Sequence, residues 1–460
     1  MEQLSSLDGV FLAIENRHTP MNIGSVAHFE GPVPTLDDLR AFLNSRLVLV
    51  PRSRQRVREP RGPFGRPIWI DDVHFDVHDH LHAISIRDRD EQNFDDLVAD
   101  LLSTHLDRRH PLWRIWLVDD PAPNQWALVV MAHHCLVDGI AGNDLLTALL
   151  SSPSESPQAA TAPWLAAPEP SRLEVLIFGL HQAISTARVH LGSLARSLSH
   201  PRRSWRRLRT TLTAAKRLWY RQHREPTSLV GPIGPHRRWR SLAIPLREIS
   251  AIQGSFSCTV NDVVLAAVTS GLRDLLVARG EFHAGRSVTV MVPVSLRISD
   301  ERGTTGNRVA NVHARLPVGH RDPLSTLRLV HAHLEELKSS HEVDATGALM
   351  NIGTKVPRFV ADRIARAVVR RQRNVETVVT NVPGPREPLS VGPNRMVAGY
   401  PVAPIAGQVR IAIAIWSYCD TLFIGITGDR ETVPDIDILV DGIRRGAEDL
   451  RRAIGEPPAR

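Results

Sequence analysis

The stretch Met131-Ala132-His133-His134-Cys135-Leu136-Val137-Asp138-Gly139 decides the fold class and the chemistry of this 460-residue chain. The apolar, β-branched run Trp126–Val130 precedes it and predicts a buried strand, and residues 140–150 after it predict a helix. Two adjacent histidines followed by Asp-Gly therefore lie on a strand-to-helix turn, where a fold presents side chains on a rigid scaffold. Because the ordinary pKa of histidine lies near neutrality, the pattern favours a base that activates a hydroxyl, amine or thiol.

The spacing within this motif has a structural interpretation. Asp138 follows His134 by four residues and precedes Gly139, which permits a backbone conformation or close approach that a side chain would forbid. We expect Asp138 to turn away from the reaction centre and pair with a cation, so that it fixes the loop that orients His134. For an isolated His-His pair, two satisfied histidines at a strand end and an Asp that caps the next helix would be the better interpretation. The complete pattern at a strand end favours catalysis instead.

The motif His-His-x-x-x-Asp-Gly resembles the active-site motif of the CoA-dependent acyltransferase superfamily. That superfamily includes chloramphenicol acetyltransferase, the condensation domains of peptide synthetases and the bacterial wax ester synthase/diacylglycerol acyltransferases. Further segments resemble signatures of the last family in their order, namely Leu4–Leu12, Pro20–Gly24, Pro111–Trp113, Thr259–Ala266, Val292–Arg297, Gly306–Asn311, Thr380–Pro385 and Gly428–Asp435. The ordered set covers nearly the whole chain. One departure is Leu229–Gly234, which lacks an asparagine that the family pattern has there.

The resemblance implies a fold of the α/β (α+β) class. It would consist of two chloramphenicol-acetyltransferase-like domains, each a mixed sheet with flanking helices, with an active-site tunnel at their interface. We expect an N-terminal domain with the histidine motif over residues 1–160, a linker and basic amphipathic helices over 161–235, and a C-terminal domain over 236–460.

Local patterns in the sequence predict several elements of these domains. Thr259 with Asp262 three residues later resembles a helix N-terminal cap, which would open the following helix. The predicted elements are helices over 35–50 and 263–277, a hairpin of 113–119 with 126–132, and strands over 287–294 and 422–426.

The resemblance also assigns roles around the motif. His134 would be the general base, which takes a proton from an acceptor hydroxyl as that hydroxyl attacks an acyl-CoA thioester. Because a thioester is already activated, one base and some oxyanion stabilisation suffice without a covalent enzyme intermediate. His133 would support the loop or hydrogen-bond its partner. An Asp among apolar residues needs a cation, and similarity to the superfamily's Asp–Arg pair implies Arg297 as the partner of Asp138. The alternative for Arg297 is a surface arginine after a strand.

Five further residues are expected to lie near the substrates: Trp113, Asn261, Asp262, Thr380 and Asn381. Trp113 is expected to form a cleft wall, whereas a helix cap alone would explain Asn261 and Asp262. Thr380 and Asn381 precede Pro-Gly-Pro, which forces a sharp turn, and the superfamily places a hydroxyl near such a segment where it faces the oxyanion. We expect neither a metal site nor a bound cofactor. Acyl-CoA would enter as a substrate, held by surface arginines and the tunnel mouth.

Composition limits the remaining classes. The cysteines Cys135, Cys258 and Cys419 show neither a disulfide framework nor a metal-ligand spacing, which suits a reducing cytoplasm. We find no signal peptide and no apolar run of about 18 residues, so no membrane-spanning helix is predicted. Residues 172–224 carry a net charge of +11 against +7 for the whole chain, which leaves −4 elsewhere. This uneven charge argues against a nucleic-acid binder and for a local anionic contact.

The same basic segment carries an apolar stripe at helical spacing. The stripe consists of Leu173, Ile177, Leu180, Ile184, Ala187, Leu191, Leu194 and Leu198, then Trp205, Leu208, Leu212, Ala215 and Trp219. A cationic amphipathic helix with tryptophans on its apolar side is typical of a membrane interface. The alternative is a connecting helix that packs on its own protein and solvates its arginines. The first interpretation predicts peripheral contact with an anionic membrane or a lipid droplet.

The sequence therefore predicts a cytoplasmic acyltransferase, peripherally associated with the inner face of the cell membrane or with lipid droplets. It would transfer a long-chain acyl group from acyl-CoA to diacylglycerol, which gives triacylglycerol. Transfer to long-chain alcohols, which gives wax esters, would be its second reaction. Two alternatives stay open, a condensation-type or polyketide-associated acyltransferase that uses a carrier-bound acyl group, and a lipid-binding protein without turnover. The N-terminal signature of a free-standing chain disfavours the first, and the intact His134 and Asp138 disfavour the second.

Overall fold

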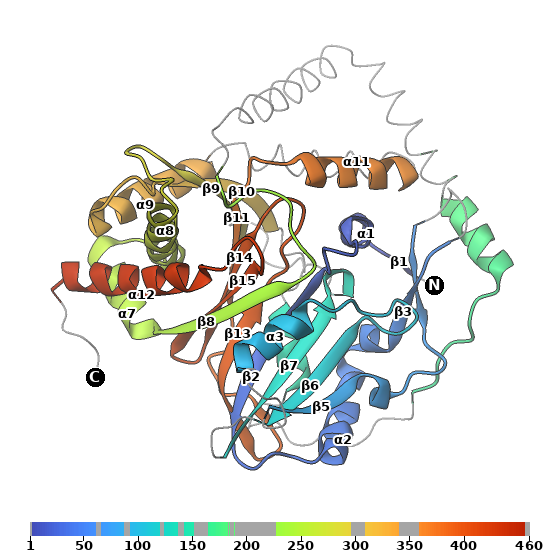
Figure 1. Ribbon diagram of the computed structural model, residues 1–460. Coiled ribbons are helices and arrows are strands. Elements are labelled where there is room, and N and C mark those ends of the chain that lie inside the picture. The colour runs from blue at the N-terminus through green and yellow to red at the C-terminus, as the bar shows by residue number, and fades with distance from the viewer. Residues whose placement is uncertain are drawn as a thin grey trace.

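A computed structural model describes residues 2–60, 66–86, 93–119, 124–136, 142–150, 164–182, 184, 188, 227–295, 309–339 and 358–455. Two six-stranded sheets, each mixed in strand direction and flanked by helices, make up the two halves of the molecule (Figure 1). This arrangement confirms the predicted mixed α/β fold.

The N-terminal sheet carries the histidine motif at its centre. Its strands, in spatial order, are β12 (Ser390–Val391), β13 (Asn394–Val402), β2 (Asn22–Glu30), β7 (Gln125–His133), β6 (Trp113–Asp119) and β5 (Leu81–Ser85). The helices of this half are α1 (Ser6–Ile14), α2 (Leu36–Arg46), α3 (Phe94–Leu102) and α4 (Gly142–Leu149). A small separate sheet is formed by β1 (Glu2–Gln3), β4 (Ile68–Asp71) and β3 (Gln55–Arg58). Because β2 and β6 both pair with β7, the end of that strand is held on both sides.

The C-terminal sheet has its helices α7, α8, α9 and α12 on one side (Figure 1). Its strands, in spatial order, are β10 (Val309–Leu316), β9 (Val288–Ser295), β11 (Thr377–Pro383), β14 (Ile411–Tyr418), β15 (Thr421–Asp429) and β8 (Arg237–Pro245). The helices are α7 (Leu246–Phe256), α8 (Val260–Ala278), α9 (Pro323–Ser339) and α12 (Ile436–Ala453). Helices α8 and α12 meet at glycines, since a Cβ on Gly442 would lie 2.7 Å from the Cα of Gly271.

The chain crosses between the two halves. After β11 of the C-terminal sheet it forms β12 and β13, and β13 pairs antiparallel with β2 of the N-terminal sheet. Side chains of the C-terminal sheet, including the buried Trp416, also enter the hydrophobic core of the N-terminal half. The predicted domain limits at 160 and 236 stay a prediction, but residues 390–402 belong by pairing to the N-terminal sheet.

Most local predictions agree with the observed elements. The hairpin forms as β6 and β7, and the strands predicted over 287–294 and 422–426 form as β9 and β15. Thr259 and Asp262 form a complete capping box at the start of α8. The helix predicted over 35–50 is shorter, because α2 ends at Arg46 and 3₁₀ turns continue the chain.

The basic segment is only partly described. Residues 172–182 are helical, with Val175 buried against Ile68 and Ile70. The opposite side, with the first residues of the predicted stripe, is exposed: Leu173 by 64%, Ile177 by 57% and Leu180 by 53%. This part of the stripe therefore does not pack on its own protein, while residues 189–226, with most of the arginines, lie outside the described residues. In the part of the chain that is described, no helix is long and apolar enough to cross a membrane.

Candidate active site

The histidine motif begins where β7 ends. The backbone N–H of His133 donates to the carbonyl of Leu112, and that of His134 donates to the carbonyl of Met21, both at 2.8 Å. The chain then turns into a short 3₁₀ helix, η4 (His134–Leu136). Because neighbouring backbone fixes both histidines at the end of a central strand, their side chains have defined directions.

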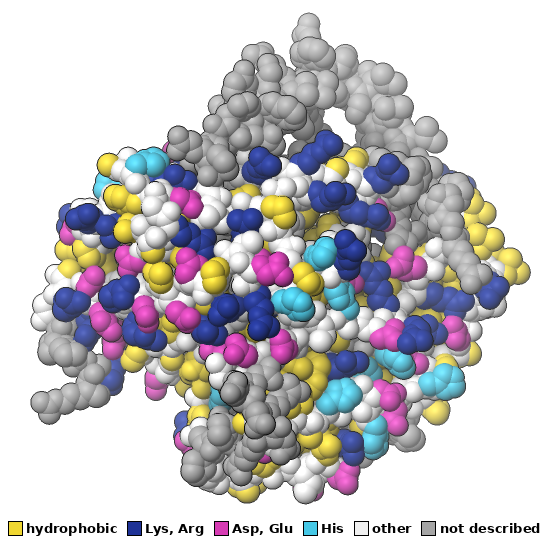
Figure 2. All heavy atoms as spheres, in the orientation of Figure 1, with side chains coloured by type: hydrophobic (Ala, Val, Ile, Leu, Met, Phe, Trp, Pro, Cys, Tyr) yellow, Lys and Arg dark blue, Asp and Glu magenta, His cyan; other side chains and the backbone are white. Residues whose placement is uncertain are grey.

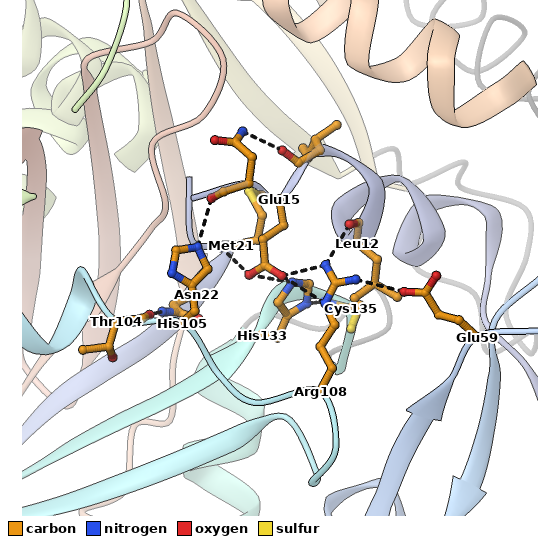
Figure 3. A network of polar contacts seen from close by, with 12 residues as sticks. Leu12, Glu15, Met21, Asn22, Glu59, Thr104, His105, Arg108, His133 and Cys135 are labelled. Atoms are coloured by element: carbon orange, nitrogen blue, oxygen red, sulfur yellow. Dashed lines mark hydrogen bonds and ion pairs between the residues drawn. The ribbon is translucent and has the colours of Figure 1, made fainter. Parts of the chain in front are cut away.

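His133 points away from solvent and towards an ionised carboxylate (Figure 3). Its side chain is 1% exposed, and its Nε2 lies 3.4 Å from Oε1 of Glu15. The backbone N–H of Cys135 donates to its Nδ1 at 3.1 Å. Nδ1 accepts this bond, and Nε2 is the ring nitrogen that faces Glu15. The Cys135 N–H and the Glu15 carboxylate thus hold the ring of His133 in one orientation.

Glu15 is itself held by Arg108. Its carboxylate, 7% exposed, accepts hydrogen bonds from Nη2 of Arg108 at 2.7 Å and from Nε at 3.2 Å. Burial alone would raise the pKa of Glu15, but its contacts with His133 and Arg108 outweigh burial and lower the pKa to about 2. Arg108 also donates to Glu59 and to the carbonyl of Leu12. The side chain behind His133 is therefore an anion in a charge-assisted network.

His134 lies beside this network in an apolar setting. Its ring stacks on Phe11 of α1, with centroids 3.8 Å apart and planes at 22°. Although part of the residue stays accessible, burial of the ring is the largest influence on the pKa of His134 and lowers it to about 4. Its Nδ1 is buried and forms no hydrogen bond with any described residue. At neutral pH His134 is thus an uncharged imidazole with an unused acceptor or donor position.

Two of the predicted substrate residues come together in the C-terminal half. Asn261, at the start of α8, and Asn381, on β11, approach each other with their side-chain amides 3.5 Å apart. Thr380 precedes Asn381 on the same strand and is partly exposed. Asp262 is fully buried, caps α8 through the N–H of Thr259, and lies 2.8 Å from Nδ1 of His331. Its contacts are those of a structural cap.

Trp113 is placed differently from the predicted cleft wall. Its side chain is 2% exposed, stacks on His80 with centroids 4.3 Å apart, and donates from its indole nitrogen to the carbonyl of Ser53 at 2.7 Å. This is the environment of a core residue, because both its ring and its polar atom are satisfied internally. Substrate contact by Trp113 stays a prediction without support from this placement.

Three predicted residues fall outside the described part of the chain. They are Asp138, Gly139 and Arg297. Their roles in supporting the site, and the Asp138–Arg297 ion pair across the two halves, stay predictions.

Comparison with known proteins identifies the family. The model named wax ester synthase/diacylglycerol acyltransferase catalytic domain matches residues 4–264, and the WS/DGAT C-terminal domain matches residues 305–451. The chain belongs to the wax ester synthase/diacylglycerol acyltransferase family. It is 34% identical to a probable diacylglycerol O-acyltransferase of Mycobacterium tuberculosis strain H37Rv, over 96% of this chain and 94% of that protein. Membership makes this chain an acyltransferase enzyme.

Solved structures agree on the fold of this acyltransferase. The wax ester synthase/diacylglycerol acyltransferase from Marinobacter aquaeolei VT8 superimposes with a TM-score of 0.67 at 23% identity, covering 99% of this chain and 100% of that one. The starter condensation domain of rhizomide synthetase, in complex with C8-CoA, gives 0.55 at 14% identity, covering 99% and 95%. The fold is therefore shared with proteins of low sequence identity.

Sequence reasoning missed Glu15 and Arg108, which the structure places against His133 of the histidine motif. Glu15 lies between the two N-terminal signature segments, Leu4–Leu12 and Pro20–Gly24. Its position next to these segments is the only sequence signal, and nothing local in the sequence indicates the contact with His133. Cys135, by contrast, is 1% exposed, and burial raises the pKa of its thiol well above the ordinary value. It is not a nucleophile at neutral pH.

A cavity of about 720 Å³ lies between α1 and α11 (Arg358–Arg371) of this acyltransferase. Glu15 and Arg108 line its inner side, and Arg366 and Arg370 line the side formed by α11. His134 is not among the lining residues, whereas Glu15, which lies next to His133, is one of them. The predicted tunnel that reaches His134 itself stays a prediction.

Proposed function

We propose that this enzyme transfers a long-chain acyl group from acyl-CoA to the free hydroxyl of diacylglycerol, with long-chain alcohols as second acceptors. Family membership supports acyl transfer, and the relative from Mycobacterium tuberculosis is named for diacylglycerol as acceptor. The observation that carries the catalytic part is the uncharged ring of His134, buried against Phe11 with a nitrogen that no described residue engages.

In the proposed reaction His134 acts as general base. It takes the proton of the acceptor hydroxyl while the oxygen attacks the thioester carbonyl carbon, giving a tetrahedral oxyanion. Collapse of that intermediate forms the ester and breaks the carbon–sulfur bond, and the departing CoA thiolate takes the proton from His134. The negative charge that develops at the reacting oxygens raises the proton affinity of a ring whose resting pKa is low. Cys135 supports this direct route because its buried thiol cannot form an acyl-enzyme.

His133 and Glu15 act as positioning residues in this proposal. The N–H of Cys135 on Nδ1 and the carboxylate of Glu15 near Nε2 hold the ring of His133 from both ends. Because His133 and His134 are adjacent, fixing the first at the strand end fixes the backbone from which the second projects. Arg108 keeps Glu15 ionised and in place.

We further propose that the enzyme works at a lipid surface, on the inner face of the cell membrane or on a lipid droplet. Diacylglycerol and long-chain alcohols reside in lipid, so the enzyme must meet them there. The exposed side of the 172–182 helix, with Leu173, Ile177 and Leu180, supports such a contact, because aliphatic side chains on an amphipathic helix insert at the acyl boundary.

Release of CoA from long-chain acyl-CoA in the presence of diacylglycerol tests the function. Wild type is expected to release CoA and form triacylglycerol, and His134→Ala to lose roughly 10²–10⁴-fold in turnover while staying folded. Cys135→Ser is the matched control, because it alters the neighbouring side chain without removing the proposed base. Near-normal turnover by folded His134→Ala would exclude the general base. Wild type that transfers only carrier-bound acyl groups, or none, would exclude the proposed donor.

A further inference from the structure

The cavity between α1 and α11 has a basic wall. From Arg358 to Arg373 the chain contains six arginines and a single acid, Asp362. Figure 2 shows dark blue basic side chains gathered in the region where α11 lies in Figure 1. The positive charge of this helix does not show in the net charge outside residues 172–224, which is −4. Acids elsewhere in the chain offset its arginines. The structure therefore reveals a second local positive field, away from the basic segment.

Only part of this charge faces the cavity. Asp362, Arg366 and Arg370 follow one another at intervals of four, which places them on one side of the helix, and all three line the cavity. Arg363 and Arg371 are as exposed as the two cavity arginines, but they are not lining residues. The helix thus offers two arginines to the cavity and two comparable arginines away from it.

The guanidinium groups of Arg366 and Arg370 have no partner among the described residues. Neither forms a hydrogen bond or an ion pair with any residue that the structure describes. Two like charges one helical turn apart repel each other. An anion between them would offset that repulsion. It would also accept bidentate hydrogen bonds from both guanidinium groups, as phosphate groups do.

The side of the cavity formed by Glu15, Glu59 and Arg108 favours an anion less. Arg108 already donates to the carboxylates of Glu15 and Glu59, so its charge is more than balanced there. This side lies next to His133. A ligand that suits the whole cavity carries its negative charge at α11 and an uncharged arm towards the histidine motif.

We propose that Arg366 and Arg370 form the subsite that holds the phosphate groups of the acyl-CoA donor. A CoA thioester has the required polarity, since its phosphates lie at one end and its pantetheine arm and thioester are uncharged. Diacylglycerol and alcohols carry no charge and gain nothing from this wall. The assignment rests on the proposed use of acyl-CoA, and it gives that donor an orientation, with its phosphates at α11 and its thioester towards His134.

The test compares two acyl donors that differ in phosphate. Arg366→Gln/Arg370→Gln is assayed with decanoyl-CoA and with the decanoyl thioester of N-acetylcysteamine, which lacks all phosphates. The ratio of kcat/KM for the two donors is expected to fall roughly tenfold, through KM for decanoyl-CoA, because about 1.4 kcal/mol of lost binding is a factor of ten. Arg363→Gln/Arg371→Gln, on the outer side of the same helix, is the matched control. An unchanged ratio, or an equal fall in the control, would overturn the subsite.

A binding measurement separates this proposal from the proposed function. Adenosine 3′,5′-bisphosphate carries phosphates of CoA but no thioester, so its binding does not depend on turnover. Wild type is expected to bind it with an affinity roughly tenfold above that of Arg366→Gln/Arg370→Gln, and the difference should shrink as salt rises. This result would support the subsite even if wild type released no CoA. Equal binding by wild type and variant, or none by wild type, would refute it whatever the activity.

Discussion

Replacing Glu15 by Gln removes the charge at the centre of the His133 network without changing its shape. The pKa of this carboxyl falls from 4.5 to about 2, which corresponds to about 3 kcal/mol of preference for the folded, ionised form. Arg108 is 36% exposed, so solvent screens part of this interaction, and we expect Glu15→Gln to lower the free energy of unfolding at pH 7 by about 1–2 kcal/mol. Turnover should fall as well, because His133 loses the anion that orients it.

The pH dependence gives this prediction a distinctive signature. The pKa of Glu15 is lower in the folded state, so its stabilisation is complete above pH about 4.5 and is lost as the pH falls towards 2. Urea unfolding of wild type and Glu15→Gln at several pH values should therefore give curves that converge over this window. The pKa of His134 also falls on folding, from 6.5 to about 4. Its contribution to stability is therefore lost as the pH falls from about 6.5 towards 4, but the loss is equal in both proteins.

Glu59→Gln is the matched control, since Glu59 contacts the same guanidinium but is 44% exposed. It should change the free energy of unfolding by less than about 0.5 kcal/mol. The reasoning fails if Glu15→Gln unfolds with the free energy of wild type at pH 7, or if the difference between them is the same at pH 7 and pH 3.

Three further predictions concern other parts of the molecule. Burial keeps His134 neutral down to pH about 4, so kcat/KM should fall to half its plateau value near that pH, under conditions where circular dichroism shows a folded protein. A fall to half near pH 6.5 would contradict this prediction. Gly271→Ala would place its Cβ 2.6 Å from a backbone carbonyl of α12 and should cost about 1–3 kcal/mol in urea unfolding, whereas Gly254→Ala in α7, with open space around it, should cost nothing. Leu173→Ser/Ile177→Ser should weaken co-sedimentation with anionic liposomes several-fold, since each side chain exposes apolar surface; unchanged binding would remove this helix from the membrane contact.

Sequence alone determined the features that depend on neighbours in the chain. The apolar runs over 113–119 and 126–132 predict the hairpin of β6 and β7, and the Thr259–Asp262 spacing predicts the cap of α8, because both features are formed by residues close together in the chain. The ordered motifs determined the family and the two histidines at a strand end. All of these features depend on residues that are close together in the chain, so they can be identified without the tertiary structure.

Tertiary structure decided which distant residues meet. Glu15 reaches His133 only because β2 pairs with β7, which brings the end of α1 against the motif. Arg366 and Arg370 face the same cavity as Glu15 only because α11 packs beside α1 (Figure 1). A single arginine-rich sequence cannot indicate which of its charges are satisfied, because an ion pair depends on side chains far away in the chain. The pKa values of Glu15 and His134 likewise follow from burial and partners that exist only in the folded protein.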